Sequence, residues 1–223
     1  HPTQTLLDLY TIQKEKGSIK GKGVVLCGDL RHGRTVHSLA IGLARFGANI
    51  TCIAPSGFEI PDGIRNILKF YECNFKEYTS LHNLAEQGSL LVRQPGTGEQ
   101  ASHLTKREQN NQEGFMNFLL ESLDVLYFTR LQRERLADEE SGKADESYFI
   151  NKQLLERSRE DALIMHPLPR TNELDYEVDQ DKRAVYFRQA GYGVPVRMAL
   201  IALLLDSVKS KAGESVFKGA RRT

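Results

Sequence analysis

The sequence lacks the features that mark membrane-spanning and nucleic-acid-binding proteins. Its 223 residues contain no apolar run near the ~18–20 residues that a membrane span needs, and the most apolar stretch, 198–205, is far shorter. Lysine and arginine number 30 against 29 aspartates and glutamates, so no dominant basic face is expected. With 40% hydrophobic and 26% charged residues, the chain is expected to fold as one generous or two small globular domains, with neither nucleic acid nor membrane as a partner.

Cysteine is scarce, since only Cys27, Cys52 and Cys73 are present and no two form a C-x-x-C pair. The spacing therefore suggests neither a zinc knuckle nor a redox dithiol. Cys27 and Cys52 lie in apolar, strand-like runs, which favours buried thiols in a reducing compartment and a cytoplasmic location. The opening residues 1–4 carry neither an initiator Met nor the apolar core of a signal peptide, so we expect a segment excised from a longer protein.

Strand-like and helix-like apolar patterns alternate along the chain. This alternation predicts βαβ units and thus an α/β fold, a three-layer α/β/α sandwich whose mostly parallel sheet is flanked by helices. Residues 87–112 are rich in Gln, Gly, Asn and Thr and are predicted to be a long, mobile insertion. Helices are expected at 2–16, 35–46, 64–71, 149–157 and 196–209, and strands at 24–27, 49–54, 74–78, 124–128, 162–165 and 184–187.

Ligands of open α/β sheets bind beyond the carboxyl ends of the strands, so polar residues after each strand are the first candidates. The first such cluster, G-D-L-R-H-G-R-T at 28–35, lies between a strand and an amphipathic helix. It approaches the pattern G-x-x-x-x-G-K-[ST], but Arg34 stands at the lysine position. A helix N-terminus can bind an anion, and an arginine fork can grip a carboxylate at two points. An ordinary strand-to-helix turn with glycines for geometry is the other interpretation.

The second cluster, T-R-L-Q-R-E-R at 129–135, also follows a strand directly. One interpretation is a solvated run of charges. The other is that Arg130 and Gln132 point into the same crevice as Arg34, where two arginines hold a dicarboxylate.

The third cluster, H-P-L-P-R at 166–170, contains two prolines that fix the backbone and remove donors. It is either a rigid connector or a turn whose Pro167 and Leu168 carbonyls accept from the amine or amide of a ligand. The fourth cluster is H-P-T-Q at 1–4, where a proline suits the first turn of a helix. It is either a frayed terminus or a helix start whose His1 donates to a carbonyl oxygen.

Together the motifs H-P-T-Q-x-L-L-D, G-D-L-R-H-G-R-T-V-H-S-L, T-R-x-Q-x-E-R, M-H-P-L-P-R and Y-F-R-Q-A, in this order, resemble aspartate carbamoyltransferase. The resemblance covers nearly the whole chain except the insertion and the last ten or so residues. It implies that 1–223 form the C-terminal, aspartate-binding domain, because the family's phosphate-binding S-x-R-T motif is missing and the N-terminal carbamoyl-phosphate domain is therefore absent. His32 and the polar insertion are more similar to the eukaryotic enzymes.

The resemblance also implies roles for two groups of residues. Arg34 and Arg130 match the arginines that bind the carboxylates of aspartate. Gln132 matches a neighbour in that pocket, and Thr35 follows the family pattern beside Arg34.

The second group faces the reacting atoms. Pro167 and Leu168 match residues whose backbone carbonyls face the amino and carbamoyl groups. His1 and Gln4 match residues that touch the carbamoyl group, with His1 polarising its carbonyl oxygen. The residues expected to be catalytic are His1, Gln4, Arg34 and Arg130.

The implied reaction is attack of the L-aspartate amine on the carbamoyl carbon of carbamoyl phosphate, giving N-carbamoyl-L-aspartate and phosphate in de novo pyrimidine biosynthesis. Catalysis then rests on positioning and on donors aimed at developing charge, with no metal or organic cofactor. The implied partners are both substrates, the N-terminal carbamoyl-phosphate domain, two further copies in a homotrimer, and other domains of a multifunctional pyrimidine-pathway protein.

Two alternatives belong beside this interpretation. Ornithine carbamoyltransferase shares the fold, but it has H-C-L-P where this chain has H-P-L-P at 166–169, and it lacks T-R-x-Q-x-E-R. An ammonium-tipped substrate would also be repelled by Arg130. The other alternative is a non-catalytic binding or assembly module of the same fold, although the complete set of motifs favours a functional half.

Overall fold

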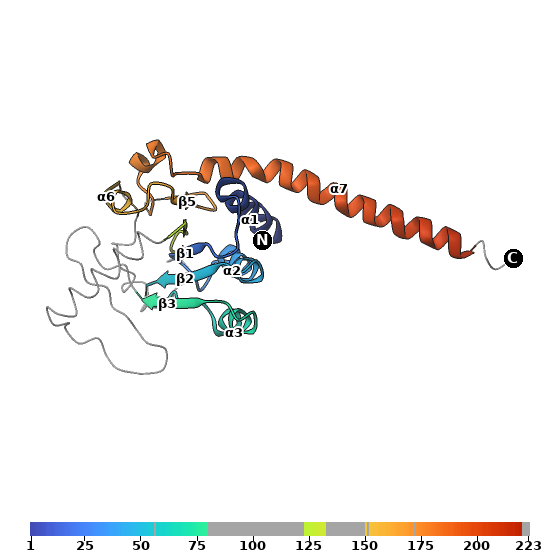
Figure 1. Ribbon diagram of the computed structural model, residues 1–223, viewed down its shortest axis with the longest axis horizontal. Coiled ribbons are helices and arrows are strands. Elements are labelled where there is room, and N and C mark those ends of the chain that lie inside the picture. Colours follow the sequence, from blue (N-terminus) through green and yellow to red (C-terminus); the bar gives the residue numbers. More distant parts are fainter. Residues whose placement is uncertain (56, 80–122, 133–149, 151, 172, 220–223) are drawn as a thin grey trace.

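Five parallel strands form the centre of the protein in the computed structural model (Figure 1). The structure describes residues 1–55, 57–79, 123–132, 150, 152–171 and 173–219. The predicted insertion at 87–112 lies outside the described residues. The strands are β1 (Gly23–Cys27), β2 (Asn49–Ala54), β3 (Phe75–Thr79), β4 (Val125–Phe128) and β5 (Leu163–Met165).

The strand order is β3-β2-β1-β4-β5, so the order of the strands reverses beside β1. From β1 the chain proceeds outward to β2 and β3, and it then returns to form β4 on the other side of β1. The carboxyl ends of β1 and β4 therefore flank the switch point of the sheet, which is where open α/β sheets bind their ligands.

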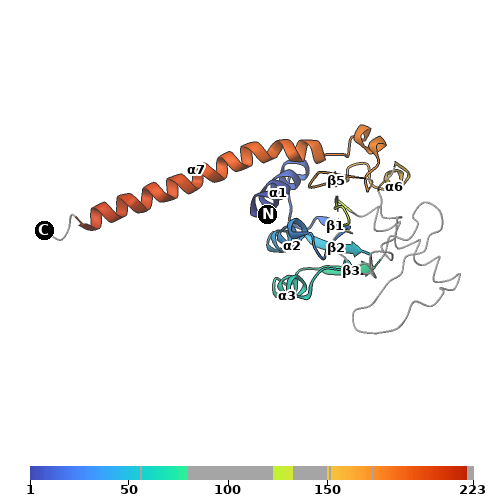
Figure 2. The ribbon, with the colours of Figure 1, turned by 180° about the vertical axis from the view of Figure 1, so that it is seen from behind.

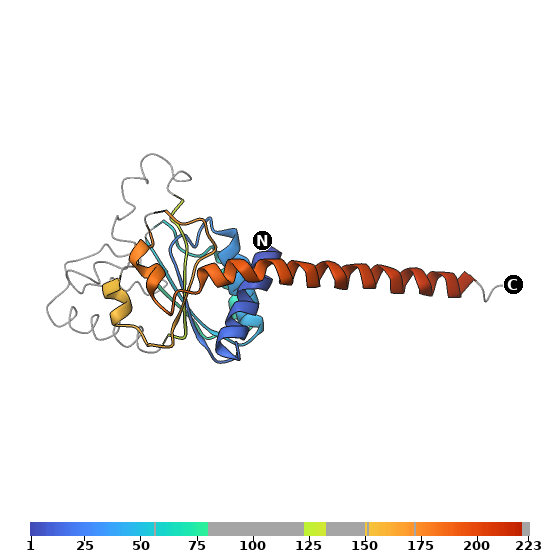
Figure 3. The same ribbon diagram turned by 90° about the horizontal axis from the view of Figure 1, so that it is seen from above.

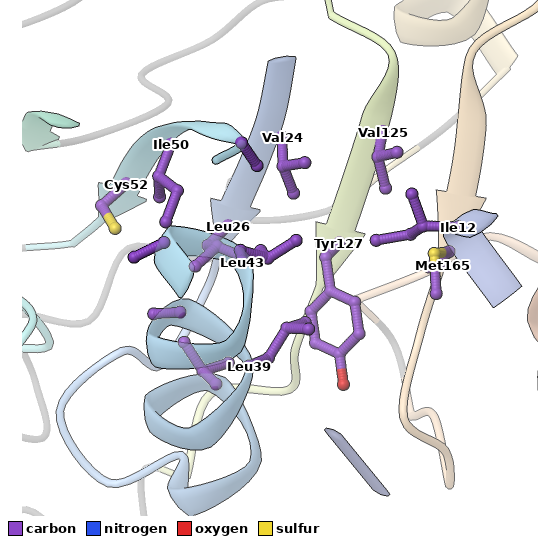
Figure 4. Packing of buried hydrophobic residues seen from close by; sticks show 14 of the residues in the cluster. Ile12, Val24, Leu26, Leu39, Leu43, Ile50, Cys52, Val125, Tyr127 and Met165 are labelled. Carbon is purple, nitrogen blue, oxygen red and sulfur yellow. The ribbon is translucent and has the colours of Figure 1, made fainter. Parts of the chain in front are cut away.

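Both faces of the sheet are covered, because side chains of a strand alternate between them. One apolar cluster joins strand residues such as Leu26, Cys52 and Tyr127 with residues of three helices at that face (Figure 4). A second cluster joins Cys27 and Phe128 with residues of two short helices and the start of the last helix. This arrangement confirms the predicted α/β fold with a parallel sheet between helical layers.

The helices of the first face are α1 (Pro2–Lys16), α2 (Arg34–Arg45) and α3 (Asp62–Phe70), and α1 lies between α2 and the last helix (Figures 1 and 2). The second face is covered by α6 (Lys152–Glu156), the 3₁₀ helix η2 (Tyr176–Gln180) and the beginning of α7 (Tyr186–Gly219). Gly17 ends α1 in the left-handed conformation at φ 74°, as its sequence predicts.

The chain after β5 differs from the prediction of a strand at 184–187 and a helix at 196–209. Ala184 makes only one parallel bridge, to Ile164, and α7 then begins at Tyr186 and continues through Pro195. The predicted strand is wrong because a short apolar run does not by itself distinguish a strand from the buried first turn of a helix. Tyr186 and Gln189, three residues apart, are the buried side chains of that turn.

Two smaller differences concern the middle of the chain. The helix expected at 149–157 is limited to α6, because Ile150 pairs with Leu174 in a parallel bridge before that helix begins. Beyond the body of the domain α7 projects as a long single helix (Figure 3), with large apolar side chains such as Met198 and Leu203 exposed. Among the described residues, no helix is both long and apolar enough to cross a membrane.

Candidate active site at the carboxyl ends of the strands

The loops that follow β1 and β4 are in backbone contact. Gly28, directly after β1, has φ 111°, and a Cβ atom placed on it would lie 2.1 Å from the carbonyl oxygen of Thr129. The N–H of Thr129 in turn donates to the carbonyl of Cys27 at 2.9 Å. Only glycine permits this approach, so the loop leading to Arg34 and the loop leading to Arg130 start side by side.

Asp29 joins the same two loops a second time. Its carboxylate is fully buried and accepts the backbone N–H of His32 at 2.7 Å and that of Gln132 at 3.2 Å. The ring Nδ1 of His32 also lies 3.2 Å from Asp29 Oδ2. Gln132, a predicted substrate contact, is thus fixed through its backbone to the loop of Arg34. Asp29 was not among the predicted site residues, although an aspartate three residues before a turn N–H is a recognisable acceptor.

Arg34 and Thr35 are the first two residues of α2, at the switch point. Gly33 precedes them, and a Cβ there would lie 2.5 Å from the carbonyl oxygen of Asp29, so the turn is tightly wound. Arg34 is exposed and Arg130 is half-buried. The side chain of Thr35 approaches the hydroxyl of Tyr127. The structure therefore brings the segments of Arg34, Thr35 and Gln132 together with that of Arg130, as the crevice hypothesis requires.

The turn after β5 is organised around His166, which is buried. Its backbone N–H donates to Gln189 Oε1 at 3.0 Å, and its ring Nδ1 accepts the N–H of Leu168 at 2.9 Å. Because Nδ1 accepts, the ring proton lies on Nε2, which is 3.0 Å from Glu173 Oε1. Leu168 has φ 51°, an uncommon conformation for a leucine, and the ring of His166 holds it there.

Glu173 supports that ring with an ionised carboxylate. Burial by itself would raise the pKa of Glu173, but the adjacent ring of His166 and the hydrogen bonds from Thr171 outweigh it and lower the pKa to about 2. Arg170, at the end of the turn, forms a two-point ion pair with Asp179 and lies over the ring of Tyr176 at 4.4 Å. The turn with the Pro167 and Leu168 carbonyls is thus clamped at both ends.

The N-terminal cluster is only partly joined to the rest. Gln4 donates through Nε2 to Asp8 Oδ1 at 2.8 Å, and Asp8 in turn contacts residues of β4 and α7. His1 is exposed at the start of α1, where its carbonyl accepts the N–H of Thr5 at 3.0 Å. Within the described part of the chain, Asp8 links Gln4 to β4 and α7, and no hydrogen bond extends from the side chain of His1. In the same part, no three His, Cys, Asp or Glu side chains are grouped to hold a metal ion.

Comparison with known proteins identifies the family to which the chain belongs. Residues 93–204 match the family model of the aspartate/ornithine carbamoyltransferase Asp/Orn-binding domain. The aspartate carbamoyltransferase catalytic subunit of Thermoplasma acidophilum is 40% identical over 206 residues, which are 92% of this chain and 56% of that relative. The chain thus spans about half the length of the curated relatives it matches.

Solved structures give the same result. The catalytic subunit of M. jannaschii aspartate transcarbamoylase has a TM-score of 0.68 and 37% identity, over 93% of this chain and 56% of its own. Aspartate transcarbamoylase from Trypanosoma cruzi in complex with aspartate and phosphate has a TM-score of 0.66 and 32% identity, over 90% and 53%. By sequence and by structure, the chain belongs to the aspartate/ornithine carbamoyltransferase family.

Proposed function

We propose that residues 1–223 are the aspartate-binding domain of an aspartate carbamoyltransferase, which transfers the carbamoyl group of carbamoyl phosphate to the amine of L-aspartate in de novo pyrimidine biosynthesis. The contact between the loops of Arg34 and Arg130, at Gly28 and Thr129, carries this proposal. It places two guanidinium-bearing segments at the switch point of the sheet, where a small dicarboxylate would lie. The names of the relatives support the same activity.

The two arginines bind the carboxylates of aspartate. An arginine fork donates two parallel hydrogen bonds to a carboxylate, which fixes its orientation as well as its position. Thr35 and Gln132 lie beside the arginines, and Gln132 is held by Asp29. Such a pocket orients the amine of aspartate toward the carbamoyl carbon, and this orientation is the main source of rate.

The reacting groups meet the turn after β5 and the start of α1. The carbonyls of Pro167 and Leu168 accept from the N–H groups of the amine and the carbamoyl group, Gln4 touches the carbamoyl group, and His1 donates to its carbonyl oxygen. The amine nitrogen forms the new bond to the carbamoyl carbon and the bond from that carbon to the phosphate oxygen breaks. The leaving phosphate takes the proton of the amine, so no side chain has to act as a base.

The charge of the pocket favours aspartate over ornithine. Arg130 would attract a side-chain carboxylate and repel a side-chain ammonium. The proline at 167 stands where ornithine enzymes have a cysteine. A non-catalytic module would not need the buried supports that Asp29 and Glu173 provide beneath the predicted contacts.

The chain spans about half the length of its curated relatives, and the proposal therefore includes further partners. A carbamoyl-phosphate domain supplies the phosphate-binding groups, and the parent enzyme is a homotrimer within a multifunctional pyrimidine-pathway protein of eukaryotic type. A cytoplasmic location is supported by the cysteines, all of which lie in the described residues and are free.

Acceptor specificity tests this proposal. A full-length protein that contains this chain is given radiolabelled carbamoyl phosphate with L-aspartate, L-ornithine or no acceptor, and the products are separated. We expect carbamoyl-aspartate alone. Carbamoylation of ornithine would favour the rival enzyme, and no transfer to either amino acid would favour the non-catalytic module.

A further inference from the structure

The buried carboxyl of Asp8 joins three elements that carry or support the proposed substrate contacts. Asp8 lies in the middle of α1 and is fully buried. Its Oδ1 accepts from Gln4 Nε2 at 2.8 Å and from Gln189 Nε2, on α7, at 2.7 Å. Its Oδ2 accepts from the hydroxyl of Tyr127, on β4, at 2.9 Å. The ring of Tyr127 stands in the apolar cluster of Figure 4.

The direction of these hydrogen bonds follows from the backbone N–H of His166, which can only donate. The backbone N–H of His166 donates to Gln189 Oε1. The amide of Gln189 therefore turns its Nε2 toward Asp8, and Asp8 Oδ1 has to be an acceptor. Because Gln4 contacts the same oxygen, its nitrogen must also face Asp8. The amide oxygen of Gln4 is then the end that points away from Asp8.

This polarity matters for the proposed reaction. The carbamoyl group presents an NH₂ that needs hydrogen-bond acceptors. If the side-chain amide of Gln4 were turned the other way, its own NH₂ would face the carbamoyl NH₂ and neither could accept. The same Asp8 oxygen also fixes Gln189, and Gln189 holds the N–H of His166 at the base of the turn that carries the Pro167 and Leu168 carbonyls.

We propose that Asp8 is a positioning residue for carbamoyl transfer: its Oδ1 sets the amide of Gln4 with the oxygen toward the carbamoyl NH₂ and, through Gln189, sets the turn that begins at His166. The inference rests on the proposed function. It assigns Asp8 no contact with substrate.

The proposed role of Asp8 requires an acceptor at Oδ1 and does not require a negative charge. With two N–H groups on Oδ1, a proton on the carboxyl would lie on Oδ2, where the oxygen of the Tyr127 hydroxyl can accept it. Oδ1 remains an acceptor in either state. Asparagine can reproduce this arrangement, with its Oδ1 facing the two glutamines and its Nδ2 facing Tyr127.

Four substitutions separate positioning from general support of the fold. Asp8→Ala removes the acceptor, and Gln189→Met removes the link to His166 while keeping the length of the side chain. Asp8→Asn keeps the acceptor. Thr11→Val is the matched control, because Thr11 is also buried on α1 but its hydroxyl donates to the carbonyl of Leu7 within the same helix, at 2.7 Å.

The first measurement is the side-chain amide signal of Gln4 by NMR in the chain itself. We expect a shifted, slowly exchanging signal in the wild type, in Asp8→Asn and in Thr11→Val. The signal in Asp8→Ala should move to the position of a solvent-exposed amide. An unchanged signal in Asp8→Ala, or a loss in Asp8→Asn equal to that in Asp8→Ala, would overturn the assignment.

The second measurement is kcat in a full-length carbamoyltransferase containing this chain, normalised to the number of active sites. We expect Asp8→Ala and Gln189→Met to lower kcat on the order of 100-fold, the cost of misplacing reacting groups by about 1 Å. Asp8→Asn should restore most of the rate. Equal rates in Asp8→Ala and Thr11→Val would refute positioning. An inactive wild type would instead contradict the proposed function. The NMR signal of Gln4 would then be the measurement that tests whether Asp8 orients the Gln4 amide.

Discussion

Gly28 and Thr129 approach so closely that a Cβ on the glycine would lie 2.1 Å from the threonine carbonyl oxygen. Side chains essentially never come within 3.0 Å of such an atom. The contact sets the spacing between the two loops that carry Arg34 and Arg130, and so it sets the width of the proposed aspartate pocket at its base.

The substitution Gly28→Ala should therefore lower the free energy of unfolding by more than the cost of placing an alanine at the positive φ of Gly28. The left-handed conformation alone costs an alanine about 1–2 kcal/mol, and the clash with Thr129 adds about 1–3 kcal/mol. Gly17→Ala is the control, because Gly17 has φ 74° but nothing within 4 Å of an added Cβ. Urea unfolding of both variants measures the difference. Equal losses of stability would show that the two loops move apart without cost.

The arginine assignment predicts kinetics in the full-length enzyme. Arg34→Lys and Arg130→Ala should each raise the KM for aspartate at saturating carbamoyl phosphate, because each loses a two-point contact worth about 2–4 kcal/mol of transition-state binding. Arg45→Lys serves as the control, since Arg45 is exposed at the opposite end of α2. An unchanged aspartate dependence in both pocket variants would remove the arginines from the site.

The elements with strong periodicity were predictable. The stripe of Val36, Leu39, Ala40, Leu43 and Ala44 predicted α2, and each of these residues is buried. The boundaries of α1 and β2 match the prediction, because Pro2, Gly17 and Pro55 punctuate the chain there.

The start of α7 and the contacts of buried Asp8 were not predictable from local pattern. The short apolar run at 184–187 has the pattern of a strand. The hydrogen bond from Val185 to Ile164 and the burial of Tyr186, which mark the start of α7, depend on the tertiary fold and cannot be seen in that pattern. Asp8 occupies a position that an amphipathic helix would give to an apolar residue. Two of its partners, Tyr127 and Gln189, are 119 and 181 residues away in sequence, so only the fold brings them to Asp8.

The raised pKa of Asp8 leads to a prediction of how the free energy of unfolding depends on pH. Burial raises its pKa from 3.8 to about 7, although hydrogen bonds from Gln189, Tyr127 and Gln4 oppose the rise. Between these values the folded protein keeps a proton that the unfolded chain has lost. The contribution of Asp8 to stability is therefore fully present below pH 3.8 and is lost as the pH rises through about 7.

The Asp8→Asn substitution should remove this dependence. Relative to the wild type, its free energy of unfolding should increase between pH 4 and 8 by up to about 4 kcal/mol, an upper bound from the size of the pKa rise. Thr11→Val, which changes no titrating group, should run parallel to the wild type over the same range. Denaturant midpoints across the pH range provide the measurement. Parallel curves for all three proteins would mean that Asp8 titrates at its ordinary pKa when folded.

The chain as it stands should fold and yet barely catalyse. Folding is expected because the sheet has an apolar cluster on each face within the described residues. Catalysis requires groups that neutralise the phosphate of carbamoyl phosphate, and the S-x-R-T motif of the family does not occur among these residues. Two assays measure carbamoyl-aspartate formation, first by the chain and then by the chain mixed with a separately made carbamoyl-phosphate domain. Recovery on mixing is the expected result, since one active site would then be assembled from two domains. Turnover by the chain near the rate of a full-length enzyme would show that the phosphate site lies within these residues after all.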